Sequence, residues 1–350
     1  MNWSKIMLMR KLRLVLIIVT LLLIPGCSLF STNAAVNTPI PVSDLLTGGN
    51  NKFTATPTPF QPVIPVANPI STPTMQPSNT ALPVNDGMIS LGLERPESQV
   101  NILLLGSDWR PGQGYRTDVI MILSLIPDTG SVTLLSFPRD LYVSIPGIGY
   151  ERINAAQAYG GVALSKETLL YNFDAHVDYY MMTNFAGFKN IIDTLGGITV
   201  YAAYELYDRC DLPQAYNKMC YIPAGLNTMN GETALWYVRS RYSTSDFDRT
   251  RRAQEVMIAI VQKTMSLNAI NRASELYNLF SSSVETDIPL DLMIKLLPMA
   301  TNIVSNPGII QRFTISEEQI THYVVPDTGA MVLIPDFDAI ADIIRKALYP

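Results

Sequence analysis

The sequence is poor in histidine, cysteine and charge. Its 350 residues include only two histidines and three cysteines, and charged residues make up 16%. Neither histidine lies in a charged segment and no Gly-x-Ser-x-Gly motif is present, so hydrolysis by a serine, cysteine or histidine side chain is poorly supported. A net charge of -5 also argues against a general nucleic-acid binder, and we expect no nucleic acid among the partners.

The N-terminus lacks a hydrophobic run of bilayer length. Its apolar run, residues 14–24, follows four basic residues and is well short of the roughly 20 residues that span a membrane. The run ends in Ile-Pro-Gly-Cys, which resembles a bacterial lipobox. We therefore expect residues 1–27 to be a signal peptide and Cys27 to be lipidated, with an uncleaved signal anchor as the alternative. Either anchor leaves the rest of the chain at the outer face of the cytoplasmic membrane and the cell wall.

Residues 28–97 differ in composition from everything that follows. Proline, threonine and serine recur throughout, and Asp44 and Lys52 are the only charged residues between Cys27 and Asn85. Such a segment cannot bury a core, so we predict a disordered tether. Residues 98–350 remain for a folded domain.

Two of the three cysteines lie close together in this domain. Cys210 and Cys220 are ten residues apart, and their spacing matches no zinc or redox motif. In an oxidising compartment outside the membrane this favours a local disulfide.

Strand and helix patterns alternate along the domain. Apolar runs at 100–108, 117–127 and 131–140 are typical of buried strands. Amphipathic patterns predict helices at 161–173, 184–197, 232–238, 246–267, 289–304 and 336–349, and residues 312–335 resemble a hairpin. The mixture predicts an α/β protein, a three-layer α/β/α domain with a central mixed sheet. The aromatic-rich segment 178–188 could line a lipid groove or pack in the core.

Charged residues follow or precede each of the three predicted strands. Ligands commonly bind where strands end and loops diverge. Each residue can also be explained as a turn former or a solvated strand end. The pairs are Asp108 and Arg110, Arg116 and Asp118, and Arg139 and Asp140.

A second charged segment, residues 238–252, holds five arginines. In an extended segment Arg239 and Arg241 would project to the same side. Ser245 is predicted to cap the next helix, on which Arg249 and Arg252 share a face. Cations at a helix start oppose the helix dipole, so we expect a diphosphate to bind there.

A diphosphate beside carboxylates implies a divalent cation. Mg²⁺, with Mn²⁺ as a possible substitute, commonly uses one or two carboxylates and completes its shell with phosphate oxygens and water. Asp108 and Asp118 are the candidate metal ligands. The alternative is that they form salt bridges with Arg110 and Arg116.

These segments together resemble the LytR-CpsA-Psr family of bacterial cell-envelope proteins. The resemblance is carried by "NILLLGSD" (101–108), "YRTDVIM" (115–121), "FPRD" (137–140), "RINAAQAYGG" (152–161), "MNGETALWYVRSR" (229–241) and "SDFDRTRRAQ" (245–254). It covers residues 99–265 best. It implies an α/β/α fold with a hydrophobic groove for a polyprenyl chain. It also implies Mg²⁺-dependent transfer of a polyprenyl-pyrophosphate-linked glycopolymer onto peptidoglycan, with release of polyprenyl phosphate.

The resemblance also assigns roles to individual residues. The metal-associated aspartates fall on Asp108 and Asp118. The catalytic, phosphate-binding arginines fall on Arg116, Arg139, Arg239, Arg241 and Arg249. The substrate-binding residues fall on Arg110, Arg152, Arg252 and Gln254. The chain departs from the family pattern at Arg152, where lysine is usual, and at Ala253, where glutamine is usual.

Two other functions remain open from the sequence. One is a pyrophosphatase that hydrolyses the lipid-linked glycan with water as the acceptor. The other is a non-catalytic lipoprotein that binds wall polymers. Product formation with and without wall fragments separates the first from a transferase, and binding without metal dependence would indicate the second.

Overall fold

The structure is a computed structural model that describes residues 89–108, 116–265 and 281–350. The chain divides into two compact units, 1–76 and 77–350, and every described residue belongs to the second. Cys27, the signal peptide, most of the tether and Arg110 lie outside the described residues. Within the described ranges, each helix is too short or too polar to cross a bilayer.

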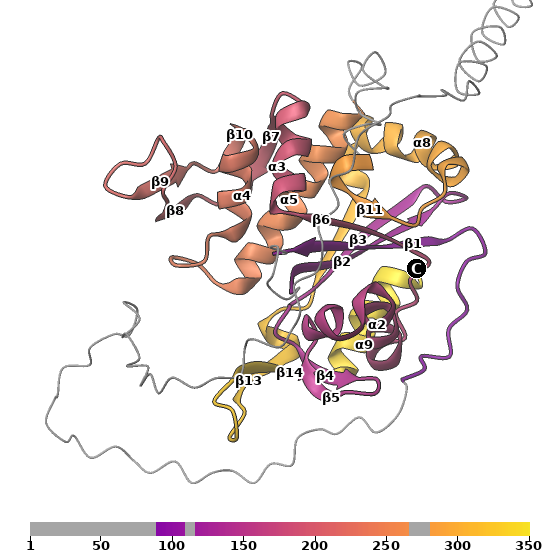
Figure 1. The fold of residues 1–350 in the computed structure, drawn as a ribbon. Helices are drawn as coiled ribbons and strands as arrows, with labels where there is room; N and C mark the ends of the chain where they lie inside the picture. The colour runs from indigo at the N-terminus through magenta and orange to yellow at the C-terminus, as the bar shows by residue number, and fades with distance from the viewer. Residues whose placement is uncertain (1–88, 109–115, 266–280) are drawn as a thin grey trace, which may run out of the picture. The chain divides into compact units, whose positions relative to one another are not determined.

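A six-stranded mixed sheet forms the centre of the domain, in the order β11-β6-β1-β2-β3-β12 (Figure 1). The three strands predicted from apolar runs form an antiparallel meander, β1, β2 and β3. β6 runs parallel to β1 and β12 runs parallel to β3. The strands are β1 (Val100–Ser107), β2 (Thr117–Ile126), β3 (Ser131–Phe137), β6 (Tyr179–Asn184), β11 (Glu285–Thr286) and β12 (Ile310–Thr314).

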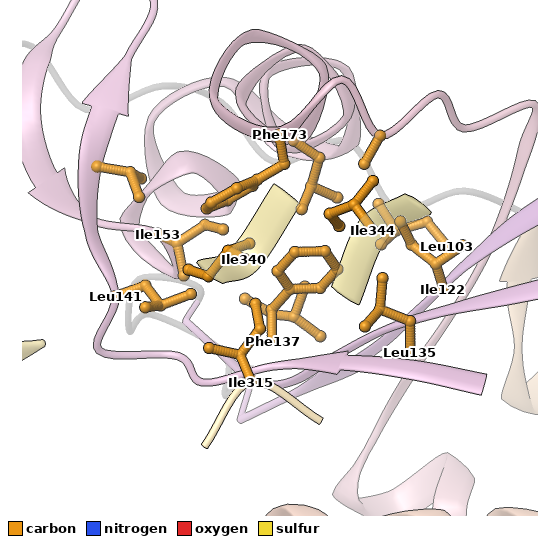
Figure 2. Packing of buried hydrophobic residues seen from close by; sticks show 14 of the residues in the cluster. Leu103, Ile122, Leu135, Phe137, Leu141, Ile153, Phe173, Ile315, Ile340 and Ile344 are labelled. Carbon is orange, nitrogen blue, oxygen red and sulfur yellow. The ribbon is translucent and has the colours of Figure 1, made fainter. Parts of the chain in front are cut away.

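Helices cover both faces of this sheet. Because side chains alternate along a strand, Leu103 contributes to one core and its neighbour Leu104 to the other. The first core is closed by α2 (Ala155–Phe173) and α9 (Phe337–Leu348), and the second by α5 (Asp246–Thr264) and α8 (Leu290–Ser305). Figure 2 shows Phe137, Phe173, Ile340 and Ile344 among the side chains of the first core. The predicted α/β/α architecture with a mixed central sheet is confirmed.

A third core lies beside the sheet. It is formed by α3 (Phe185–Thr194), α4 (Gly231–Arg239), part of α5, and the pair β7 (Ile198–Ala202) and β10 (Gly225–Met229). The hairpin β8 (Leu206–Arg209) and β9 (Met219–Ile222) extends from it (Figure 1). The predicted disulfide between Cys210 and Cys220 joins this hairpin, with a Cα–Cα distance of 5.7 Å.

Two further hairpins and two short 3-10 helices, η2 (Pro307–Ile309) and η3 (Glu317–Gln319), complete the described structure. β4 (Tyr142–Ile145) pairs with β5 (Gly149–Arg152), and β13 (Ile320–Val324) pairs with β14 (Met331–Pro335). The second lies within the predicted hairpin 312–335, whose first residues instead belong to β12 and the central sheet.

The structure differs from the predicted element boundaries in three places. The segment 178–188, left open between groove and core, forms β6 and the start of α3. The helix predicted from 161 begins at Ala155, with a break where Gly161 adopts φ 62°, a conformation that favours glycine. Arg95, assigned to the tether, forms a 2.7 Å salt bridge with Asp178, so ordered structure begins before residue 98.

Candidate active site

Four strand ends meet at one edge of the central sheet. β1 and β6 are parallel and both end there, while antiparallel β2 begins there and antiparallel β3 ends there. This topology brings together Asp108 after β1, Asp118 at the start of β2 and Arg139 after β3. The N-terminus of α5 lies against the same edge, because Arg249 Nη2 donates to the carbonyl oxygen of Asp118 at 3.5 Å.

A β-bulge sets the position of Asp118. Val119 is paired with Gly106 and Thr117 with Ser107, so Asp118 is an extra residue between two paired positions. A bulge of this kind re-aims a side chain and is frequent beside active sites. Asp118 is half-buried, and its carboxylate accepts a hydrogen bond from Nη1 of Arg139.

Arg139 is shared between two carboxylates. Besides Asp118, its Nε contacts Oδ2 of Asp140 at 3.3 Å. Burial alone would lower the pKa of Arg139, but the charges of Asp118 and Asp140 outweigh burial and raise it. Asp140 also faces Arg152, whose Nε lies 3.4 Å from its Oδ1. The Nη2 of Arg152 donates to the backbone oxygen of Met331 at 2.8 Å.

Arg249 adds a buried cation close to half-buried Arg139. The helix start that positions it is fixed by the predicted capping box, in which Ser245 and Asp248 each accept from the other's backbone N–H. The Nη2 of Arg249 donates to Oδ2 of Asp246 at 2.8 Å. Burial lowers the pKa of Arg249; Asp246 opposes this, and the charge of Arg139 lowers the pKa further. Two arginines that repel each other in a partly desolvated place favour an anion between them.

We refer to this group as the charge cluster. It contains three arginines and three aspartates from β2, α5 and the segments around β4 and β5. Its members are Asp118, Arg139, Asp140, Arg152, Asp246 and Arg249. Three of them, Asp118, Arg139 and Arg249, were predicted as metal or catalytic residues. Asp246 was not foreseen as a partner, although its i,i+3 spacing from Arg249 could have indicated the pair.

Asp108 and Arg116, the described residues on either side of 109–115, are joined by two hydrogen bonds. The backbone N–H of Asp108 donates to the oxygen of Arg116 at 3.1 Å, and the N–H of Arg116 donates to Oδ1 of Asp108 at 3.1 Å. The side chain of Arg116 is exposed. The ion pair considered between Asp118 and Arg116 is formed with Arg139 instead. Groups of three or more metal-ligating side chains do not occur in the described ranges.

Arg239 and Arg241 do not lie on an extended strand as expected. α4 continues through Arg239, and the chain leaves the helix at Ser240. The guanidinium carbon of Arg239 lies 4.5 Å from the ring centroid of Phe185, directly after β6. Arg241 is exposed. Both side chains therefore lie outside the charge cluster, on the segment that leads into α5.

Arg252 and Gln254, assigned to substrate binding by the resemblance, form hydrogen bonds within the protein. Arg252 is 1% exposed, and it donates to the backbone oxygens of Tyr237, at 2.8 Å, and Ser240. The buried amide of Gln254 donates to Ser136 Oγ at 2.7 Å and to the oxygen of Phe313 at 3.0 Å. These bonds hold α4 and the sheet against α5. The buried position of Arg252 could have been inferred from the apolar Val256, four residues further along α5.

A cavity of about 390 Å³ opens at the ends of β1 and β6. Its lining is mainly polar and includes Ser107, Thr183, Asn184 and the segment 281–285. Ser107 directly precedes Asp108, so the cavity adjoins the candidate site. A second cleft of about 10 Å³ lies between Asp118 and Arg249. Neither has the dimensions and lining of the apolar groove expected from the resemblance, which stays a prediction.

Comparisons with known proteins give a consistent result. The model of the LytR_cpsA_psr family matches residues 72–344. TagU of Oceanobacillus iheyensis, named a polyisoprenyl-teichoic acid–peptidoglycan teichoic acid transferase, is 35% identical over 59% of this chain and 64% of its own length. TagT of Bacillus subtilis, with the same enzyme name, is 32% identical over 60% of this chain and 66% of its own. The match thus spans just under two thirds of these relatives.

Solved structures share the fold. The crystal structure of TagV from Bacillus subtilis aligns with a TM-score of 0.60 at 24% identity, over 73% of this chain and 98% of that one. A structure of TagT bound to LI-WTA aligns with a TM-score of 0.56 at 25% identity, over 73% and 92%.

Proposed function

The chain belongs to the LytR_cpsA_psr family, and we propose that it is an extracytoplasmic phosphotransferase. In this proposal it moves a glycopolymer from a polyprenyl pyrophosphate carrier onto peptidoglycan and releases polyprenyl phosphate. The observation that carries the proposal is the convergence of Arg139 and Arg249 beside Asp118 at one sheet edge. The names of the relatives, which describe transfer of teichoic acid to peptidoglycan, support the same reaction class.

The chemistry requires positioning and charge neutralisation more than covalent help. A sugar hydroxyl of peptidoglycan attacks the phosphorus on the glycan side, and the bond from that phosphorus to the bridging oxygen breaks. The bridging oxygen leaves as part of polyprenyl phosphate. Arg139 and Arg249 would bind the pyrophosphate oxygens in place of part of their present contacts with Asp118 and Asp246, and stabilise the charge that develops there. Because both arginines are already oriented, little reorganisation is needed.

Asp108 and Asp118 would hold Mg²⁺ or Mn²⁺. Among the described residues, each carboxylate uses its Oδ1 in a hydrogen bond and leaves Oδ2 without one, so each has an oxygen to offer. A pair of carboxylates suffices for Mg²⁺ when phosphate and water complete the shell. When bound, the cation would supply further positive charge against the phosphate oxygens.

The remaining assignments surround this centre. We propose that exposed Arg116, Arg239 and Arg241 contact the carrier phosphates or the glycan as the substrate enters. Arg152 orients Asp140, and through it Arg139. The hydrophobic groove, Arg110 and lipidated Cys27 with its tether belong to the same proposal, which places the domain at the outer face of the membrane.

A reconstituted transfer assay tests the proposal. Full-length protein is incubated with a radiolabelled polyprenyl-pyrophosphate-linked glycan, with and without purified peptidoglycan, and both polyprenyl phosphate and wall-bound label are measured. We expect polyprenyl phosphate to be released only when peptidoglycan is present, together with wall-bound label, and both to be lost in Arg249→Ala. Equal release of polyprenyl phosphate without peptidoglycan would replace the transferase by a pyrophosphatase. Binding of the glycan with no product would indicate a non-catalytic binding protein.

A further inference from the structure

The hairpin β8–β9 carries exposed aromatic rings outside the charge cluster. Tyr207 on β8 pairs directly with Tyr221 on β9, and the two are 56% and 54% exposed. Directly opposite residues of an antiparallel pair have Cβ atoms about 5 Å apart, so these rings are neighbours on one face. The opposite face of the hairpin packs inward, where Leu206 and Cys220 are buried. The two tyrosine rings therefore contribute little to the packing of the core.

A third exposed ring contacts the hairpin from the segment between α4 and α5. Arg209 lies two residues after Tyr207 and projects to the same side of β8. Its guanidinium lies 3.6 Å from the ring centroid of Tyr242 and donates to the Tyr242 hydroxyl at 2.7 Å. Tyr242 is 67% exposed and directly follows Arg241. We call Tyr207, Tyr221 and Tyr242 the aromatic face. It is continuous with the segment that leads into the candidate active site.

The aromatic face is held rigidly. The Cys210–Cys220 disulfide joins the hairpin. The buried carboxylate of Asp208 accepts the backbone N–H of Tyr242 at 3.0 Å. The indole N–H of Trp236, on α4, donates to the backbone oxygen of Arg209 at 2.7 Å. A surface fixed in this way loses little conformational entropy when a ligand binds.

The local charge argues against a membrane or a polyanion as the ligand. Residues 203–222 contain three carboxylates and two cations, a formal charge of -1. One of the cations, Arg209, is already stacked on Tyr242. Anionic lipids attract clustered Lys and Arg, at about 1 kcal/mol per residue, and this segment has no such cluster. On the hairpin an anionic polymer would meet the same unfavourable charge, whereas a neutral sugar chain would not; exposed Arg241, next to Tyr242, lies on the segment between α4 and α5 and not on the hairpin.

We propose that the aromatic face binds the glycan strand of peptidoglycan, the acceptor, beside the charge cluster. The inference rests on the proposed transferase function. The apolar face of a pyranose ring presents C–H bonds, which pack favourably on the electron-rich face of an aromatic ring. Polar groups for the sugar amides and hydroxyls are adjacent, since the hydroxyl of Tyr221 donates to Glu205 at 2.9 Å. A pair of neighbouring rings with a third exposed ring nearby offers more than one sugar ring a stacking surface.

Binding of full-length protein to purified, polymer-free peptidoglycan sacculi, measured by co-sedimentation, tests this. We expect the double variant Tyr207→Ala/Tyr221→Ala to bind about tenfold more weakly. Tyr207→Phe/Tyr221→Phe keeps the rings and should stay within about threefold of wild type. Tyr159→Ala removes a 58% exposed tyrosine from α2 and should change nothing. Tyr242→Ala gives an independent variant outside the disulfide hairpin, with a loss of a few-fold.

Two further ligands and the kinetics complete the test. Vesicles of phosphatidylglycerol and phosphatidylethanolamine, and a soluble polyglycerol phosphate, should bind the double alanine variant and wild type equally. A loss confined to vesicles or to the polyanion would overturn the proposal in favour of that ligand. In the transfer assay, KM for peptidoglycan should rise about tenfold while kcat at saturation is unchanged.

The outcomes separate this inference from the proposed function. A wild-type protein that transfers no polymer, yet binds sacculi through the tyrosines, would refute the transferase and keep the aromatic face. If the double alanine variant and Tyr242→Ala bind sacculi as wild type does, the aromatic face is refuted, whatever the transfer assay gives.

Discussion

Arg249 holds the carboxylate of Asp246 at 2.8 Å within the first turn of α5, while the same nitrogen faces the backbone oxygen of Asp118 at 3.5 Å. A cation near a helix N-terminus is opposed by the helix dipole, and here an anion three residues earlier offsets that cost. The carboxylate is one that phosphate can replace, because guanidinium binds both in the same planar geometry. We therefore expect the ion pair to keep Arg249 oriented until a phosphate group replaces the carboxylate.

Arg139 should be the most sensitive residue of the charge cluster. Arg139→Ala removes one cation of the proposed pyrophosphate site, takes the arginine partner from Asp118 and leaves Asp140 with Arg152 alone. We expect kcat/KM for polymer transfer to fall about 10²- to 10³-fold. Arg345→Ala, which breaks an exposed pair with Asp342 on α9, is the matched control. Transfer by Arg139→Ala at the wild-type rate would exclude Arg139 from the reaction.

Removal of divalent metal should abolish transfer. EDTA treatment is expected to stop polymer transfer, and Mg²⁺ or Mn²⁺ should restore it. Mg²⁺ should also raise the thermal unfolding temperature of wild type, because a ligand that binds only the folded state stabilises it. Asp108→Asn and Asp118→Asn should lose both effects, and exposed Asp342→Asn should keep them. Full transfer in EDTA would remove the metal from the proposal.

Arg252 should matter for stability more than for substrate binding. Arg252→Met leaves the buried oxygens of Tyr237 and Ser240 without a donor, which we expect to lower the free energy of unfolding by about 3 kcal/mol. Urea unfolding measures this, with exposed Arg312→Met as the control. Unchanged stability with loss of transfer would instead support the substrate-binding role that the resemblance implies.

The disulfide should stabilise the domain by closing a short loop. Replacing both Cys210 and Cys220 by serine is expected to lower the free energy of unfolding by about 2–3 kcal/mol, from the loop entropy of a separation of 10 residues. Wild-type protein under reducing conditions should lose the same amount, and the serine variant should not respond to reductant. A variant as stable as wild type would show that the hairpin is ordered without the bond.

The capping box of α5 should make stability depend on acid. Burial alone would raise the pKa of Asp248, but hydrogen bonds from Ser245 and the charge of Arg251 outweigh it and lower the pKa below its ordinary value. The resulting stabilisation is complete above the unfolded pKa, near 3.9, and is lost as pH falls through the lower folded pKa. Ser245→Ala should cost about 1 kcal/mol at neutral pH.

Ser245→Ala should also weaken the acid dependence of the free energy of unfolding, because the hydrogen bonds that depress the pKa of Asp248 are partly removed. Unfolding in urea at pH 7, 4 and 3 measures both effects. Ser316→Ala is a matched control, because the capping box of η3 (Glu317–Gln319) pairs Ser316 with Gln319, which does not titrate. This variant should leave the acid dependence as in wild type. An equal loss at pH 7 and pH 3 would show that the cap does not act through Asp248.

Much of the central sheet could be predicted because its meander is built from long apolar runs. Those of β1, β2 and β3 are buried on both faces, and such strands carry no competing polar pattern. β6 was left open because Tyr179 and Thr183 are only half-buried, which leaves a weak alternation. The short two-stranded sheets around the third core have too few residues for a periodic signal.

The site was predictable only to the level of strand ends. Three antiparallel strands joined in sequence must return to the same edges, which brings Asp118 and Arg139 together whatever else the chain does. The sequence pattern does not predict whether an arginine side chain is free to bind a substrate or is bound to backbone oxygens. Arg252 is bound by oxygens at the C-terminal end of α4, and the path of that segment after Arg239 is not encoded in any local pattern.

The bulge in β2 makes the position of the Asp118 carboxylate depend on one extra residue in this strand. Because Asp118 is one extra residue between two paired positions, deleting a single codon there would restore regular pairing with β1. We expect the polypeptide still to fold, since the meander beyond Val119 would keep its register, while Arg139 would lose Asp118 and keep only Asp140 as a carboxylate partner. We therefore expect an in-frame deletion of this one residue to leave the fold intact while it removes the proposed transferase activity.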